Sequence, residues 1–139
     1  MKKYLYIVIW LMLSVAASAQ KDKDAVEALR MEYVGKRLDL SKAEADKFWP
    51  VYNEYNDKIK VLRKNFRQSF KKPVDALSDK EIEELYLLDL QTKQAEAELY
   101  KVYRDKLKLI IGAKRMLKLI AAENDFKKEV IKTIQDKSD

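Results

Sequence analysis

The residue types that most often do chemistry in proteins are scarce in this chain. Its 139 residues include no histidine and no cysteine, which removes the Ser-His and Cys-His nucleophile pairs and the usual zinc and copper ligands. Carboxylates pair at helical spacing in Glu54/Asp57 and Glu81/Glu84, where a weak cation could bind, but solvated helix faces have the same spacing. We therefore predict no catalytic residues, no cofactor and no transition metal.

Charge is the second chemical resource, and it is segregated. Residues 57–72 carry seven Lys or Arg against one Asp, whereas residues 79–98 carry two Lys against seven acids. In an antiparallel hairpin these blocks could neutralise each other along a solvated edge. Alternatively, a basic patch at the hairpin tip attracts acidic or unfolded chains. Its candidate binding residues are Arg63, Lys64, Arg67, Lys71 and Lys72.

Two short motifs predict where the positioning helices begin. Ser41 and Glu44, and again Ser78 and Glu81, have the spacing of a capping box, in which each side chain bonds the other residue's backbone amide. Each box precedes a long polar-apolar periodic stretch. With only two Gly and two Pro in the chain, the composition is typical of long helices joined by short connections.

The apolar spacing predicts an all-α fold of four helices, over about 22–36, 41–70, 78–110 and 113–134. The second has apolar residues separated by four and three residues in alternation, the seam of a coiled-coil hairpin or of a partner chain. Pro50 lies two turns into it and predicts a kink or a short break. Gly112 is expected to separate the last two helices. We expect an elongated, curved, kinked antiparallel hairpin that dimerises.

Aromatic residues gather at the start of the second predicted helix. Phe48, Tyr52 and Tyr55 share the seam and Trp49 lies beside it, so most of this cluster is expected in the core. In the alternative interpretation, Trp49 or a tyrosine is exposed and anchors a bound protein. Glu123 lies between apolar neighbours on the last helix and is expected to pair with a cation or an amide, fixing helix register.

The first residues have the pattern of a cleavable export signal. Lys2 and Lys3 precede an apolar run from Tyr4 to about Leu13, and Ala17-Ser18-Ala19 forms a small-residue cleavage site. We predict a signal peptide over residues 1–19 and one domain over residues 20–139, in the periplasm. Cleavage lowers the formal net charge from +6 to +4. Export makes nucleic acid a poor candidate partner and leaves anionic surfaces or acidic proteins.

These features together resemble the Spy/CpxP-like family of small periplasmic helical proteins, whose hallmark is a repeated Leu-Thr-x-x-Gln motif. The chain is most similar to the branch labelled sensors of ECF-type sigma factors, through the stretches Glu44–Tyr55 and Ala122–Phe126. The hallmark Thr and Gln are here Ser and Glu, which keep the capping chemistry, and the histidine ligands of the metal-sensing relatives are absent.

The resemblance implies a four-helix fold, often a curved dimer, that acts without ATP. Two functions remain open. One is a chaperone for misfolded envelope proteins in the envelope stress response. The other is a sensor that engages a specific membrane regulator.

Overall fold

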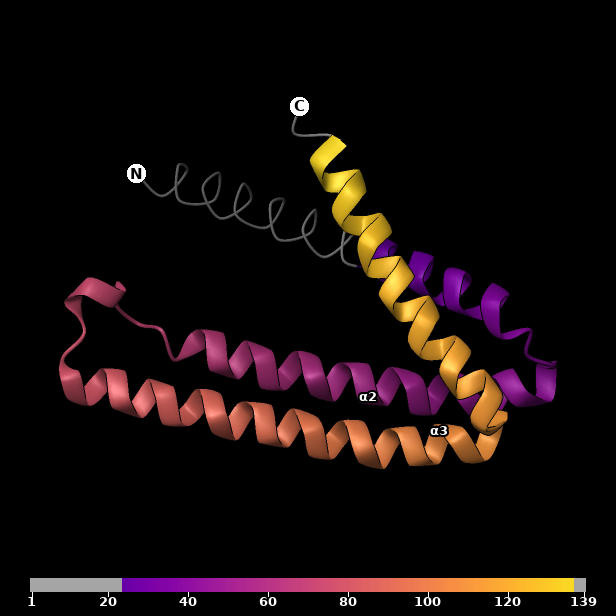
Figure 1. Ribbon diagram of the computed structural model, residues 1–139, viewed down its shortest axis with the longest axis horizontal. Coiled ribbons are helices and arrows are strands. Elements are labelled where there is room, and N and C mark those ends of the chain that lie inside the picture. Colours follow the sequence, from indigo (N-terminus) through magenta and orange to yellow (C-terminus); the bar gives the residue numbers. More distant parts are fainter. Residues whose placement is uncertain (1–23, 137–139) are drawn as a thin grey trace, which may run out of the picture. The chain divides into compact units, whose positions relative to one another are not determined.

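The computed structural model describes residues 24–136, and all regular secondary structure in this range is helical (Figure 1). They form a helix over residues 24–38, α2 (Lys42–Gln68), the short 3-10 helix η1 (Val74–Ala76) and α3 (Asp79–Asp136). The predicted signal peptide lies outside the described residues. The described chain divides into two compact units, which are treated separately: unit 1 contains residues 24–39 and 118–136, and unit 2 contains residues 40–117.

The predicted capping boxes open both long helices. At α2 the Ser41 hydroxyl accepts from the Glu44 amide at 3.2 Å, and the Ser41 amide donates to the Glu44 carboxylate at 3.0 Å. At α3 the Ser78 amide donates to Glu81 at 2.9 Å and the Glu81 amide donates to the Ser78 hydroxyl at 3.4 Å. Each box satisfies two amides that lack a partner within the helix, so both predicted helix starts are confirmed.

Pro50 does not interrupt α2, so the short break that the sequence allowed is absent: the helix is continuous from Lys42 to Gln68, about 40 Å at 1.5 Å per residue. It ends two residues before the predicted Phe70, where the Ser69 amide donates to the Phe66 carbonyl at 3.0 Å. The helix over 24–38 extends two residues past the predicted end at Lys36. It stops at Asp39, which adopts the left-handed conformation (φ 49°) and whose amide donates to the Gly35 carbonyl.

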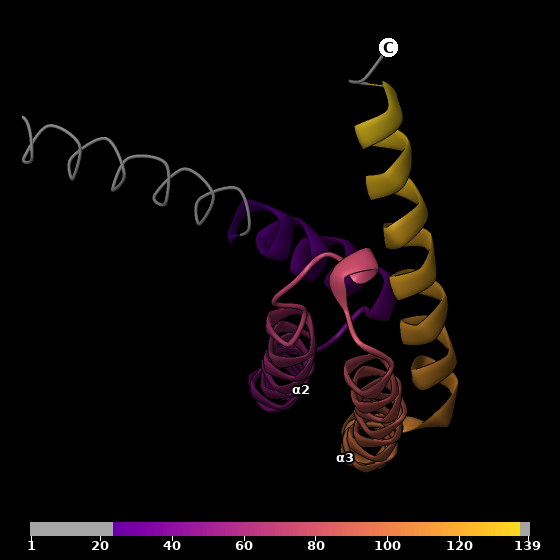
Figure 2. The ribbon, with the colours of Figure 1, turned by 90° about the vertical axis from the view of Figure 1, so that its left-hand side faces the viewer.

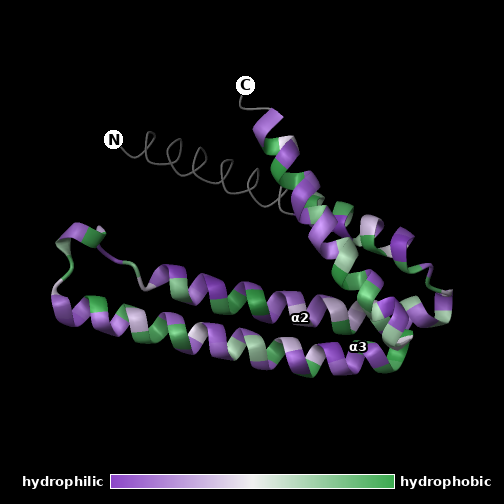
Figure 3. Cartoon of the chain, viewed as in Figure 1, coloured by the Kyte–Doolittle hydropathy of each residue, from purple (hydrophilic) through white to green (hydrophobic). Residues whose placement is uncertain are grey.

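Within unit 2, α2 and the first part of α3 run antiparallel, side by side, in two perpendicular views (Figures 1 and 2). Apolar and polar residues alternate around both helices (Figure 3). Burial is confined to one end. We call this end the base, residues 40–59 and 103–117, where the buried side chains are Phe48, Tyr52, Ile59, Tyr103, Leu107, Ile111 and Met116.

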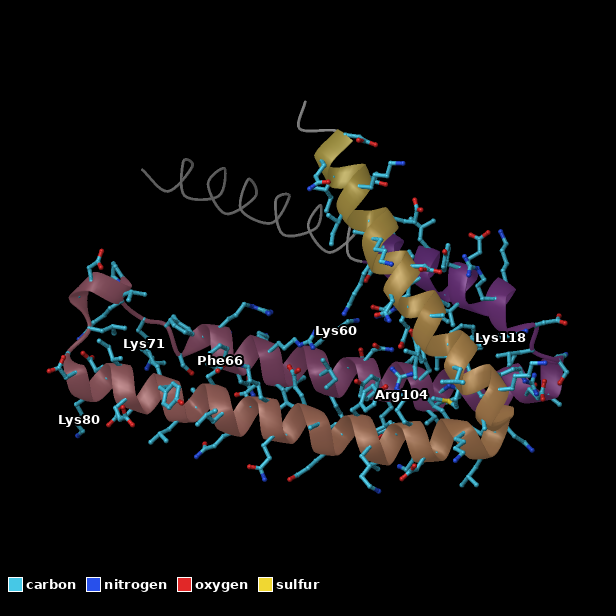
Figure 4. All side chains as sticks on the ribbon, in the orientation of Figure 1. Lys60, Phe66, Lys71, Lys80, Arg104 and Lys118 are labelled. Atoms are coloured by element: carbon cyan, nitrogen blue, oxygen red, sulfur yellow. The ribbon has the colours of Figure 1, made fainter. Side chains whose placement is uncertain are left out.

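The rest of the hairpin, residues 60–102, is called the arm, and it has no buried residue anywhere along its fully described length. Its apolar side chains are half-buried between the helices or exposed on their outer faces. Figure 4 places Phe66 and Arg104 between α2 and α3, and Lys80 on the side of α3 that points away from α2.

Unit 1 has its own small core. Val34 and Leu38 from the helix over 24–38, and Leu119 and Ala122 from α3, are buried there. Tyr33 and Phe126 pack with ring centroids 5.7 Å apart, and Arg37 lies over the Tyr33 ring and within 3.4 Å of the Asp125 carboxylate. The helix over 24–38 and the last part of α3 therefore hold each other through one apolar stripe and a polar edge.

Gly112 is the point at which α3 changes direction. Its backbone is non-helical, with φ 78° and ψ 164°, a combination open almost only to glycine. The predicted break is confirmed, but it occupies a single residue, so the described residues contain three α-helices where four were predicted. No connecting loop separates the predicted third and fourth helices.

Replacing Gly112 by Ala is expected to destabilise the fold by about 1–3 kcal/mol. An added Cβ meets nothing within 4 Å, so the cost comes from the backbone conformation and not from a clash. The measurement is the free energy of unfolding in urea. Gly35→Ala is the matched control because Gly35 lies inside a helix, where alanine is favoured over glycine. A Gly112→Ala protein as stable as the parent would contradict this account of the break.

Candidate functional site

The aromatic cluster at the start of α2 separates into a core part and a surface part. Phe48 and Tyr52 are fully buried and stack with ring centroids 5.3 Å apart, so the core interpretation holds for them and Tyr52 leaves the set of candidate binding residues. Trp49 is half-buried and meets Phe48 and Tyr52 edge-on, at 4.9 and 5.7 Å. Trp49 is thus only partly covered and remains a candidate binding residue.

Tyr55 lies in a second cluster, where α2 and α3 meet at the junction of base and arm. Its ring is half-buried, 5.7 Å from Tyr103 and 6.5 Å from Tyr100. The Arg104 guanidinium stacks over Tyr55 at 5.5 Å and over Tyr100 at 4.7 Å. These contacts join both helices at Tyr55, and of the four side chains in the cluster only Tyr100 is exposed (42%).

Two ion pairs connect the two charge blocks across the hairpin, which agrees in part with the neutralisation interpretation. Arg63 makes a two-pronged ion pair with Glu96, at 2.7 and 3.0 Å, and Lys72 lies 2.7 Å from Glu81. Arg63 and Lys72 are therefore engaged within the chain. Lys64, Arg67 and Lys71 are exposed, and the described part of the chain gives them no ion pair. These three lysine and arginine side chains make up what remains of the predicted basic patch.

The most constrained polar contact closes the base of the hairpin. Both nitrogens at the end of the Arg115 guanidinium donate to the Glu44 carboxylate, one of them at 2.8 Å, and the Arg115 Nε–H donates to the Ile111 carbonyl at 2.9 Å. Glu44 thus serves the capping box and binds α3 beside Gly112. The hydrogen bonds from Arg115, and then from the Ser41 amide, lower the pKa of Glu44 to about 2.

The second capping glutamate has the same double role at the arm tip. The Lys72 ammonium, and then the Ser78 amide and hydroxyl, lower the pKa of Glu81 to about 2. Sequence analysis found both glutamates as caps but not Arg115, which is 71 residues from Glu44. The sequence shows that cations follow Gly112, but this pattern does not indicate which of Lys114, Arg115 and Lys118 contacts Glu44.

Glu123 lies in unit 1 and is half-buried. It does interact with the rest of the chain, in line with the expectation that a charge at this position has a partner. That the partner of Glu123 is a cation or an amide, and that the contact fixes helix register, stays a prediction.

Unit 1 also contains an open apolar groove of about 600 Å³ between the helix over 24–38 and the end of α3. Val26, Leu29, Tyr33, Phe126, Val130 and Ile134 line it. Leu29 and Ile134 are about three-fifths exposed, at 58% and 60%. The sequence pattern did not predict this groove.

Comparisons of the chain with protein-family models, with curated proteins and with solved structures found no match. Within residues 24–136 no three His, Cys, Asp or Glu side chains gather as metal ligands would. No helix in the same range combines the length and the apolar character needed to cross a membrane. What the described site offers is a set of apolar and cationic surfaces.

Glu44→Gln is expected to lower stability at neutral pH and to flatten its loss in acid. Because the pKa of Glu44 is lowered in the folded protein, its carboxylate contributes stability above about pH 4.5 that disappears as the pH falls through about 2. The measurement is the urea midpoint of unfolding at neutral and at acidic pH. Glu83→Gln, at an exposed position on α3, is the matched control. Equal acid dependence in Glu44→Gln and the parent would contradict the role of the Arg115 contact.

Proposed function

We propose that this protein is an exported, ATP-independent binding protein that holds exposed apolar segments of misfolded envelope proteins. The observation that carries the proposal is the arm, where two helices present apolar side chains without a core to bury them. The most exposed apolar residues of the arm helices are Val61 (56%), Ile82 (46%), Tyr86 (57%), Leu87 (48%), Leu90 (47%) and Val102 (48%). Surfaces of this kind mark interaction sites in proteins.

Charge supports the same proposal. Lys64, Arg67 and Lys71 are exposed at the end of α2 and in the connection after it, and cations beside an apolar surface raise the association rate of acidic or unfolded chains. Trp49 and Tyr100 add partly exposed aromatic rings, a residue type that contributes strongly at binding interfaces.

The sequence pattern predicts a signal peptide over residues 1–19, a periplasmic location, a single domain over residues 20–139 and a kinked hairpin, and the proposal includes them. The resemblance to Spy/CpxP-like proteins adds a curved dimer and supports a four-helix arrangement, in which the parts of α3 before and after Gly112 count as separate helices. A second copy packed along the arm would cover side chains that one copy leaves exposed, which is the physical reason to include dimerisation.

A sensor role is the second candidate, favoured by the Glu44–Tyr55 stretch that resembles the sigma-factor sensor branch. In that role the arm engages one membrane regulator and releases it under stress. The two candidates differ in selectivity: a chaperone accepts many unfolded chains, and a sensor accepts one partner.

Light scattering of a chemically unfolded client, diluted with and without residues 20–139, tests the chaperone proposal. We expect near-stoichiometric suppression of aggregation that weakens with salt. Tyr86→Gln with Leu90→Gln should raise the amount required roughly tenfold, as expected for about 1.4 kcal/mol of lost binding. Ile131→Gln, at a site 56% exposed in unit 1, should change little.

Either of two results would count against a general chaperone. No suppression at any ratio would remove it and leave the sensor role, which is then tested by isolating a single envelope partner. If the Tyr86/Leu90 variant and the Ile131 control suppressed aggregation equally, the client-binding surface would not be in the arm.

A further inference from the structure

Two leucines beside Gly112 are the most exposed large apolar side chains of the described residues. Leu109 is 89% exposed and Leu117 is 70% exposed. Both belong to unit 2 and lie within five residues of the break in α3. Leu109 is two residues from both Leu107 and Ile111, which are buried, so it occupies the opposite face of the helix. Neither leucine contributes to the core of the base.

The charge around these leucines is of one sign. The chain has no acid between Asp105 and Glu123, and this stretch contains Lys106, Lys108, Lys114, Arg115 and Lys118. Arg115 is bound to Glu44 and Lys106 lies over the Tyr103 ring at 4.7 Å. Lys108 and Lys114 are exposed, and no ion pair within the described chain neutralises them. We give the name elbow surface to the exposed residues on either side of Gly112, namely Leu109 and Leu117 with Lys106, Lys108 and Lys114.

We propose that the elbow surface attaches the protein peripherally to an anionic phospholipid membrane. Exposed leucines enter the boundary between headgroups and acyl chains while neighbouring lysines remain with the lipid phosphates. Each lysine near an anionic surface adds attraction that decays within a Debye length. This attachment is additional to the client or partner binding assigned to the arm.

The charge argues against a second copy of this chain as the occupant. A two-fold contact between elbow surfaces places the lysines of one copy beside those of the other, because an isologous interface pairs the same patch with itself. No acid of the elbow stretch is available to compensate them. An anionic lipid surface supplies negative charge and an apolar layer together.

Co-sedimentation with phosphatidylcholine vesicles, with and without phosphatidylglycerol, tests this proposal. The full chain and the chain beginning at Gln20 are both used, each compared only with its own variants, so that the apolar run near the N-terminus affects both members of a pair equally. We expect the parent to bind only the vesicles that contain phosphatidylglycerol, and less at high salt. Leu109→Gln with Leu117→Gln should weaken this binding about tenfold.

Two matched controls separate the elbow from general surface properties. Leu29→Gln with Ile131→Gln removes two exposed apolar side chains elsewhere and should bind as the parent does. The second control compares two triple Lys→Gln variants. The variant at Lys106, Lys108 and Lys114 should weaken vesicle binding more than the variant at Lys127, Lys128 and Lys132, which are exposed on the last part of α3. Helical circular dichroism checks that every variant is folded.

Three results would overturn the proposal. They are binding that does not depend on phosphatidylglycerol, leucine variants that bind as the parent does, and equal losses from the two lysine sets. Capture of an acidic protein without vesicle binding would likewise replace the membrane as the partner. Because client aggregation is not measured, failure here is distinct from failure of the chaperone proposal.

Discussion

Two packed helices can bury only the stripe along which they touch, and this geometric limit governs the hairpin. At the base, Phe48 and Tyr52 of α2 and Leu107 of α3 reach full or nearly full burial. Along the arm the same pair of helices buries nothing completely, although the apolar content of both helices continues (Figure 3). The arm therefore leaves apolar side chains exposed to solvent. This exposure explains both the binding that we propose for the arm and the low stability that we expect of it.

Polar contacts hold the hairpin in register where apolar contacts are weak. The Glu44–Arg115 contact joins the start of α2 to α3 beside Gly112, and Lys72–Glu81 joins the two ends of the connecting segment. Exposed ion pairs contribute little individually, but opposite charges at matched positions disfavour a slipped pairing. Both capping glutamates take part in such a contact, so the residues that start the helices also align them.

Local features of the sequence predicted most of the helix boundaries. Ser41 and Ser78 start helices because capping depends on residues three apart, and Gly112 breaks α3 because its backbone conformation excludes other residues. Arg115 was not found, since its partner is 71 residues away and no local pattern records such a distance. Tyr52 was placed among candidate binding residues although it is buried, because a coiled-coil seam and an exposed aromatic stripe have the same spacing. Of the two effects expected of Pro50, the break is absent, since α2 is continuous from Lys42 to Gln68, and the kink stays a prediction.

Hydrogen exchange of backbone amides, at a concentration at which the chain sediments as a monomer, tests the central claim most directly. Amides with few buried neighbours open more readily than amides in a core. The account predicts that helical amides of the arm, residues 60–102, exchange faster than helical amides of the base, and that a bound client or second copy slows them. Equal protection of arm and base in the free monomer would contradict the claim that the arm lacks a core of its own.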